Sequence, residues 1–201
     1  MDRLIEGYRQ FRATTWPAQR SRYEELADGQ NPETLVISCS DSRVDPQTVF
    51  GAGPGELFIV RNVAALVPKY QPDTNYHGTS AALEFGVRVL KVKRIVVLGH
   101  ARCGGVQAMV EGAPDEAKDF VVPWMGIAKD VLKSRPTPAT VTNKLAHYEK
   151  EVVRLTLENL LSFPWISDAV KSGALGLHGF RFDVSTGVLG LLEGDKFVSV
   201  E

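Results

Sequence analysis

The chain has 201 residues, of which 44% are hydrophobic and 23% charged, a composition typical of a globular protein. Its formal net charge of −1 gives no reason to expect a nucleic acid or an anionic membrane as a partner. We therefore expect one domain over residues 1–201, long enough to bury a sizeable core. No apolar run approaches the length of a bilayer span, and no signal-peptide core is present, so the sequence predicts a cytoplasmic protein.

Residues 1–27 are expected to form a helical arm. Leu4, Tyr8 and Phe11 recur at helical spacing and give a narrow apolar stripe, and Thr14-Thr15-Trp16-Pro17 interrupts the pattern. Pro17 suits the first turn of a second helix. A short amphipathic arm has little to bury against in its own chain, so we expect it to pack on a neighbouring subunit.

Three apolar runs, 34–39, 57–60 and 94–98, predict strands that are buried on both faces. A helical pattern at 79–90, with Thr79 or Ser80 as N-cap, lies between the second and the third. Alternating strands and helices indicate an α/β fold with a central, mostly parallel β-sheet flanked by helices.

The second half of the chain adds helices and a hairpin. Residues 119–133 and 141–161 are predicted to be helical, and the apolar stripe of the second helix is interpreted as core. Short strands at 174–183 and 188–192 flank a turn at 185–187 and predict a hairpin at one edge of the sheet. Upstream, Asp45 and Pro46 are expected to open a short helix.

Two of the predicted strands end in polar clusters. Cys39, Asp41 and Arg43 follow the first strand at alternate positions, and His100 and Cys103 follow the third. If these strands are neighbours, the carboxyl edge of the sheet brings the clusters together. Two thiolates and one imidazole suit zinc better than magnesium or calcium, and the arginine can hold the carboxylate.

Simpler explanations exist for each part of this pattern. Cys39 and Cys103 could be small buried hydrophobic residues, and a single His-x-x-Cys is weak support for a metal. Gly104 and Gly105 could form a tight turn or present backbone N–H groups to an anion. A phosphate loop is a poor alternative, because no Gly-Lys-Ser/Thr follows. Both clusters together, each after a buried strand, favour a metal site.

Several motifs, taken in order, closely resemble the β-class carbonic anhydrases over nearly the whole chain. They are Cys39-Ser40-Asp41-Ser42-Arg43-Val44, Pro54-Gly55-Glu56-Leu57-Phe58, Arg61-Asn62-Val63-Ala64, His77-Gly78-Thr79-Ser80-Ala81-Ala82-Leu83-Glu84-Phe85, Gly99-His100-x-x-Cys103-Gly104-Gly105, Leu157-Glu158-Asn159-Leu160-Leu161 and Leu177-His178-Gly179-Phe180. The resemblance implies a carbonate dehydratase, a lyase that reversibly hydrates carbon dioxide to bicarbonate and a proton through a zinc-bound hydroxide.

The resemblance also implies the roles of individual residues. Cys39, His100 and Cys103 would bind one Zn²⁺ per chain, with water or hydroxide in the fourth position. Asp41, held by Arg43, would accept a hydrogen bond from the hydroxide and orient it. In some members of the family the equivalent aspartate binds the zinc in a closed, inactive form, so Asp41 would be a metal ligand only in that form.

Three positions favour the open form of the plant-like branch. Members with the closed form tend to have a tryptophan and a glycine where this chain has Val36 and Ser38. Gln30 stands where the plant-like branch places a glutamine that contacts substrate across a dimer interface. We therefore expect Asp41 to pair with Arg43 rather than with the metal.

The resemblance also suggests a substrate pocket. Phe58, Val63 and Phe85 fall on its apolar positions, although a plain core role explains them equally well, and Gly104 is assigned to substrate binding. The implied assembly is a homodimer or homotetramer.

Two other functions fit the same motifs. One is a carbonyl sulfide or carbon disulfide hydrolase at the same site, and the other is a non-catalytic zinc-binding regulatory module. Retention of Asp41 and Arg43 argues against the module, because a structural zinc site needs no unbound carboxylate–guanidinium pair. The other histidines, His77, His147 and His178, are expected to be surface or packing residues, and His77 has the best claim among them to a proton-shuttle role.

Overall fold

The computed structural model describes residues 1–200 and contains a six-stranded sheet in the order β2-β1-β3-β4-β5-β6. The strands are β1 (Thr34–Cys39), β2 (Leu57–Asn62), β3 (Arg94–His100), β4 (Gly176–Phe182), β5 (Leu189–Glu193) and β6 (Lys196–Ser199). The first four strands are parallel, and β5 and β6 continue the sheet antiparallel. The predicted α/β fold with a mostly parallel sheet is confirmed.

The two central strands are buried along their length. β1 pairs with β2 on one side and with β3 on the other, in a register that aligns Val36 with Val96 and Ile37 with Val97. All four of these side chains are buried. Because both faces of β1 and β3 are covered, these strands read as continuous apolar runs in the sequence.

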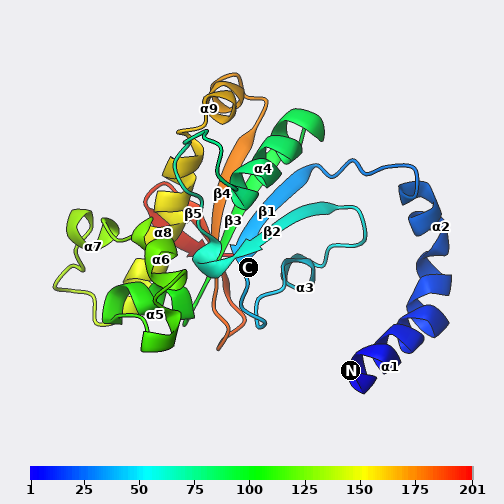
Figure 1. Cartoon of the computed structure of the whole chain (residues 1–201), viewed down its shortest axis with the longest axis horizontal. Coiled ribbons are helices and arrows are strands. Elements are labelled where there is room, and N and C mark those ends of the chain that lie inside the picture. The colour runs from blue at the N-terminus through cyan, green and yellow to red at the C-terminus, as the bar shows by residue number, and fades with distance from the viewer. Residues whose placement is uncertain (201) are drawn as a thin grey trace.

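Most helices cover one face of the sheet (Figure 1). A core of buried side chains joins β1 and β3 to α4 (Gly78–Glu84), α8 (Lys144–Leu160) and α9 (Pro164–Lys171). A second cluster joins α5 (Gly104–Glu111) and α6 (Val121–Gly126) to α8 beneath the carboxyl edge. This packing fixes the chain segments that follow β1 and β3.

The opposite face is only partly covered. Val36, Val96 and Leu98 pack there against Val49 and Phe50, which belong to the short α3 (Pro46–Phe50). An apolar groove of about 360 Å³ remains on this face. It is lined by Thr34, Val36, Phe50, Leu57, Arg94, Val96, His178 and Phe180.

The N-terminal arm extends away from the sheet (Figure 1). It consists of α1 (Asp2–Gln10), a π-helical segment η1 (Phe11–Thr15) and α2 (Trp16–Leu26), none of which has a buried residue. The predicted interruption around Pro17 is thus a π-helical segment rather than a break: Pro17 has no N–H to donate to the preceding turn, and the N–H of Trp16 donates to the carbonyl oxygen of Phe11, five residues back.

Other differences concern weaker patterns. The continuous helix predicted at 119–133 is wrong: the chain forms α6, a turn region and α7 (Val131–Ser134). The predicted helix at 141–161 begins later, as α8, with the Asn143 side chain as N-cap. The N-cap of α4 is His77, without a side-chain hydrogen bond, rather than Thr79 or Ser80. Among residues 1–200, no helix has the length and apolarity to cross a bilayer.

The remaining short helical elements connect these parts. They are η2 (Val63–Ala65), η3 (Phe85–Val89) and η4 (Asp115–Ala117). The segment η2 follows β2 directly, and Ala64 and Ala65 there have positive φ values of 65° and 54°. This tight turn keeps the chain close to the carboxyl edge of the sheet.

Candidate metal centre

Three buried side chains meet at the carboxyl edge of the sheet. Cys39 ends β1, His100 ends β3, and Cys103 follows as the N-cap residue of α5. Because β1 and β3 are adjacent parallel strands, their ends lie side by side. The Sγ atoms of the cysteines and one imidazole nitrogen all lie within 4.8 Å of one another. This is the clustering that the sequence predicted.

The imidazole of His100 is oriented for coordination. Its Nδ1 lies 2.9 Å from the carbonyl oxygen of Ala101, so Nδ1 carries the ring proton and donates a hydrogen bond to that oxygen. Its Nε2 is buried and has no hydrogen-bond partner among the described residues. A buried nitrogen with a free lone pair beside two thiols fits a zinc ion, whose preferred ligands are thiolates and imidazoles.

The two thiols are close enough to share a proton. Their sulfur atoms lie 3.9 Å apart, and both cysteines are free. The hydrogen bond from Cys103 lowers the pKa of Cys39 to about 4, and the same contact, together with burial, raises the pKa of Cys103. A divalent cation bound between the two sulfurs would allow both to be thiolates at this distance, because its charge would offset the repulsion between them.

Asp41 lies at the rim of this group. Its Oδ1 accepts hydrogen bonds from the backbone N–H and Nε of Arg43, both at 2.9 Å, and its Oδ2 accepts one from Nη2 at 2.7 Å. Oδ2 also lies 3.9 Å from Nε2 of His100. The hydrogen bonds from Arg43 hold the pKa of Asp41 well below its usual range.

A second arginine, to which the sequence analysis assigned no role of its own, supports the same loop. Arg61, near the end of β2, donates to the carbonyl oxygens of Cys39, Asp41 and Val44 at 3.0, 2.7 and 3.1 Å. It also lies 3.7 Å from the carboxylate of Asp45. Its sequence position, directly after a predicted buried strand, was the available signal for a role at the carboxyl edge.

Two of the predicted substrate-binding residues are close to the metal-ligand group. Gly104 directly follows Cys103 and is the first residue of α5. Val63 follows β2 and contacts α5: a Cβ atom added to Gly105 would lie 2.6 Å from its Cγ1. Trp124 of α6 donates a hydrogen bond at 2.8 Å to the carbonyl of Val63 and holds it in place.

The other three predicted substrate-binding residues, Gln30, Phe58 and Phe85, lie far from the metal-ligand group of the same chain. Phe58 pairs in register with Leu35, four residues before Cys39, which is about 13 Å of strand. Phe85 stacks on Phe58 with ring centroids 5.8 Å apart, and Gln30 is exposed before the start of β1. The structure therefore does not bring these three side chains to the metal-ligand group within one chain.

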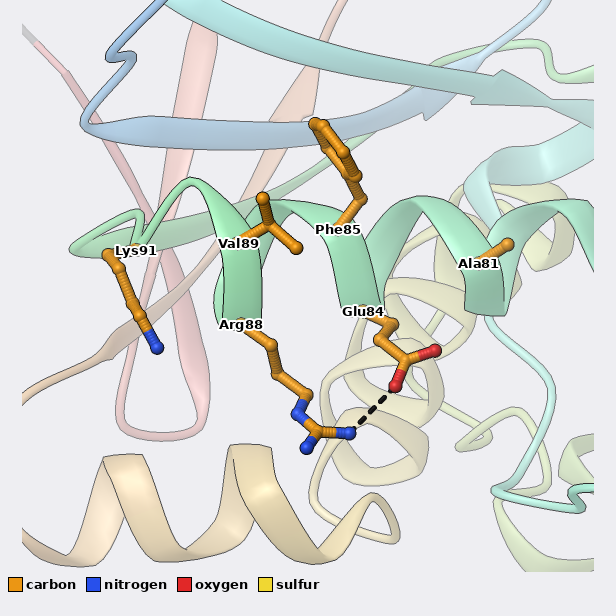
Figure 2. A pocket seen from close by; sticks show the side chains of 6 residues that line it. All are labelled: Ala81, Glu84, Phe85, Arg88, Val89 and Lys91. Atoms are coloured by element: carbon orange, nitrogen blue, oxygen red, sulfur yellow. Dashed lines mark hydrogen bonds and ion pairs between the residues drawn. The ribbon is translucent and has the colours of Figure 1, made fainter.

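Phe85 lies on an exposed part of its helix. Its side chain points toward β1 and β2, while Glu84 and Arg88 point away from the sheet and form an ion pair at 2.7 Å (Figure 2). Phe85 and Val89 are 44% and 61% exposed. These apolar side chains line a shallow surface pocket with a volume of about 550 Å³.

The histidine proposed as a proton shuttle has a carboxylate partner. His77 Nε2 lies 2.7 Å from Oδ1 of Asp73 at a half-exposed position. His147 is hydrogen-bonded to the carbonyl of Arg135, and His178 is exposed on β4. None of these contacts joins a histidine to the metal-ligand group.

The fold and the site together define a class: an α/β protein with a Cys-His-Cys donor set at the carboxyl edge of a parallel sheet. A family model described as carbonic anhydrase matches residues 34–189. The chain belongs to the β-class carbonic anhydrases, which are lyases of the carbonate dehydratase type. The family membership and enzyme class expected from the motifs are thus confirmed.

Sequence relatives and solved structures agree with this assignment. The chain is 39% identical over 184 residues to beta carbonic anhydrase 5, chloroplastic, of Arabidopsis thaliana, covering 89% of this chain and 60% of that protein's length. It is 33% identical to beta carbonic anhydrase 3 of the same plant, covering 97% and 78%. The structure of the β-carbonic anhydrase CcaA superposes with a TM-score of 0.89 at 28% identity, covering 100% and 92%. A tetrameric β-carbonic anhydrase of Sordaria macrospora gives 0.83 at 26% identity, covering 100% and 98%.

Proposed function

We propose that this chain is a zinc enzyme that catalyses the reversible hydration of carbon dioxide to bicarbonate and a proton. The observation that carries the proposal is the unpartnered Nε2 of His100 beside the thiols of Cys39 and Cys103, with the carboxylate of Asp41 within 3.9 Å. The donor set fits one Zn²⁺ per chain. Zinc, when bound, acts as a Lewis acid that lowers the pKa of a coordinated water from 15.7 to about 7.

The residues around the donor set would orient the reactants. Asp41 stays ionised because Arg43 binds both of its oxygens, so it remains a hydrogen-bond acceptor for the attacking oxygen. Both oxygens are engaged by Arg43, which favours the open form in which Asp41 does not ligate the metal. The backbone N–H at Gly104 would face the developing bicarbonate at the start of α5.

A complete substrate pocket would need two chains. Val63 and Gly104 lie beside the metal-ligand group, whereas Gln30, Phe58 and Phe85 lie at the far end of the sheet from it. We infer that each pocket combines Val63 and Gly104 of one chain with Gln30, Phe58 and Phe85 of another. The apolar side chains would then provide a pocket for uncharged CO2.

The exposed apolar surfaces of the arm support a homodimer or homotetramer. Leu4, Ile5 and Tyr8 on α1 are 73%, 44% and 61% exposed, and Phe85 and Val89 are exposed beside the sheet. Clustered apolar residues of this kind typically become buried on association. We propose that the arm packs on a second copy of the chain.

The cytoplasmic location expected from the sequence stays a prediction, since one relative is named as chloroplastic.

The test is stopped-flow CO2 hydration by the zinc-loaded chain, with Asp41→Asn as the variant. The assay is run at about pH 8, above the pKa expected for the metal-bound water. We expect wild-type activity and a loss of about 10²-fold in kcat/KM for the variant, which retains zinc but loses the orienting charge. Zinc content is measured for both proteins, so that metal loss is separated from misorientation.

The alternatives predict different results in the same experiment. One zinc per chain without hydration activity would contradict the proposal and favour a regulatory module. Faster hydrolysis of carbonyl sulfide or carbon disulfide than hydration of CO2, measured side by side, would instead favour the hydrolase. A crystal structure with Asp41 bound to the metal at the assay pH would contradict the open form.

A further inference from the structure

The turn between His100 and Cys103 is supported by a carboxylate that the sequence patterns did not reveal. Glu149 lies on α8, and only 2% of its side chain is exposed. Its Oε1 accepts a hydrogen bond from the backbone N–H of Arg102 at 2.5 Å. Its Oε2 accepts two more from Arg181 of β4, at 3.0 and 2.7 Å. A buried carboxylate thus joins the metal-ligand turn to the helix and the sheet beneath it.

Arg102 is the residue in this turn that most needs support. Its φ of +55° lies in the left-handed region, which is unfavourable for a residue with a Cβ atom. This conformation turns the chain so that His100 and Cys103, on either side of Arg102, face the same point. The hydrogen bond to Glu149 stabilises the Arg102 amide in the orientation that the turn requires.

The same peptide segment reaches the other ligand loop. The carbonyl oxygen of Arg102 accepts a hydrogen bond at 3.1 Å from Nη2 of Arg43, and Arg43 binds Asp41. Glu149 is therefore connected through the backbone of Arg102 to the pair that orients Asp41. The backbone of Arg102 therefore links the turn between His100 and Cys103 to the loop that follows Cys39.

The charge of Glu149 is compensated within the network. Arg181, with 14% of its side chain exposed, pairs with Glu149 and also lies 3.5 Å from the carboxylate of Asp183. A buried carboxylate is tolerated only when it is paired and hydrogen-bonded, and both conditions are met here. Arg181 thereby holds Glu149 in the position from which it reaches Arg102.

We propose that Glu149, held by Arg181, is a positioning residue that keeps the metal-ligand turn in its left-handed conformation and so slows the release of zinc. The inference rests on the proposed zinc site, but it concerns retention of the metal rather than the reaction. Second-layer partners of ligands typically change metal affinity by 10–100-fold when they are removed.

The experiment measures zinc release from the loaded full-length chain to a chelator. The first variant is Glu149→Gln, which keeps an acceptor for the Arg102 N–H but loses the charge. The second is Glu149→Met combined with Arg181→Met, which removes both charges without leaving either one buried and unpaired. We expect the double variant to release zinc about 10–100-fold faster than the wild type, and Glu149→Gln to lie between them.

A matched control is available on the same helix. Glu151 is also mostly buried on α8 and pairs with two arginines, Arg135 and Arg154. We expect Glu151→Gln to lower thermal stability while zinc release stays at the wild-type rate. Equal zinc release from the Glu149 and Glu151 variants would overturn the inference, because it would reduce Glu149 to a general stabilising role.

The left-handed turn supplies a rescue test. Glycine adopts positive φ without a Cβ clash, so Arg102→Gly should make the turn less dependent on Glu149. We expect the acceleration of zinc release caused by the double variant to be severalfold smaller in the Arg102→Gly background. An acceleration of unchanged size in that background would contradict the role assigned to the turn.

Failure of the proposed function has a different signature. A wild-type chain that retains zinc but hydrates no CO2 overturns the proposed activity and leaves this inference in place. If the wild-type chain binds no zinc, hydrogen exchange of the Arg102 amide decides. Protection in the wild type that is lost in the double variant supports the positioning role, and equal exchange overturns it.

Discussion

The guanidinium of Arg43 binds both oxygens of Asp41, and this pairing governs the charge of the carboxylate. The hydrogen bonds lower the pKa of Asp41 in the folded chain, because they favour the ionised form. In the unfolded chain the pKa returns to about 3.9. The pair therefore stabilises the fold fully above about pH 4, and this contribution is lost as the pH falls through the folded-state pKa.

This dependence of stability on pH leads to a prediction for the variant Arg43→Gln. The variant should have a smaller free energy of unfolding than the wild type at neutral pH, and the difference should shrink as the solution is acidified below about pH 4. Urea denaturation of both proteins at several pH values measures the difference, and zinc-free samples avoid acid release of the metal. A difference that grows on acidification would contradict the assignment.

At the residue scale, the three candidate ligands could be predicted from the sequence because each one ends or follows a buried strand. Cys39 and His100 are the last residues of β1 and β3, so the topology alone places them together. Glu149 could not be predicted in the same way. Its partners are a backbone N–H 47 residues away and a side chain 32 residues away, and neither contact leaves a pattern in the sequence.

At the scale of elements, the start of α5 must approach η2 closely. A Cβ atom added to Gly105 would lie 2.6 Å from Cγ1 of Val63 and 3.1 Å from Cβ of Ala64. The same addition at Gly104 would meet no atom within 4 Å. Packing therefore requires a glycine at position 105 but not at position 104.

We predict that Gly105→Ala destabilises the fold by about 1–3 kcal/mol, because the extra methyl group overpacks the contact between α5 and η2. Gly104→Ala is the matched control and should change stability by less than about 1 kcal/mol, since alanine is favoured over glycine in a helix. Thermal unfolding of the two variants measures the difference. Similar losses at both positions would show that the close approach is not what requires glycine.

The strength of the patterns also explains which elements could be predicted. β1 and β3 are continuous apolar runs because they are buried on both faces. Residues 119–133 carry an apolar pattern, but Pro123 and Gly126 limit the helix to a short α6. α9 was not predicted, although Pro164 opens it and Ile166 is fully buried. β6 has only four residues at the sheet edge, which is too short for a clear alternation.

At the scale of the molecule, one chain does not place all of the expected pocket residues together. Cys39 lies at the carboxyl end of β1, and Gln30, Phe58 and Phe85 lie toward its other end. A twofold arrangement that brings the two ends of different chains together would complete two pockets at once. The exposed arm and the partly covered sheet face are available for that contact.

Subunit mixing tests this arrangement. One chain carries Cys103→Ser, which removes a metal ligand, and the other carries Gln30→Ala with Phe85→Ala, which truncates the distal residues. Each homo-oligomer should be inactive. The mixed dimer, purified with two different tags, contains one site with both defects and one with none, so it should recover about half of the wild-type activity per dimer.

The matched control places all three substitutions in one chain and pairs it with a wild-type chain. In that dimer the wild-type metal group faces truncated Gln30 and Phe85 positions, and the other site lacks its metal ligand, so both sites are defective. We expect activity near background, although the number of substitutions per dimer is unchanged. Equal activity in the two mixed dimers would mean that Gln30 and Phe85 do not act on the metal site of a partner chain, whereas the predicted difference depends on pockets shared between subunits.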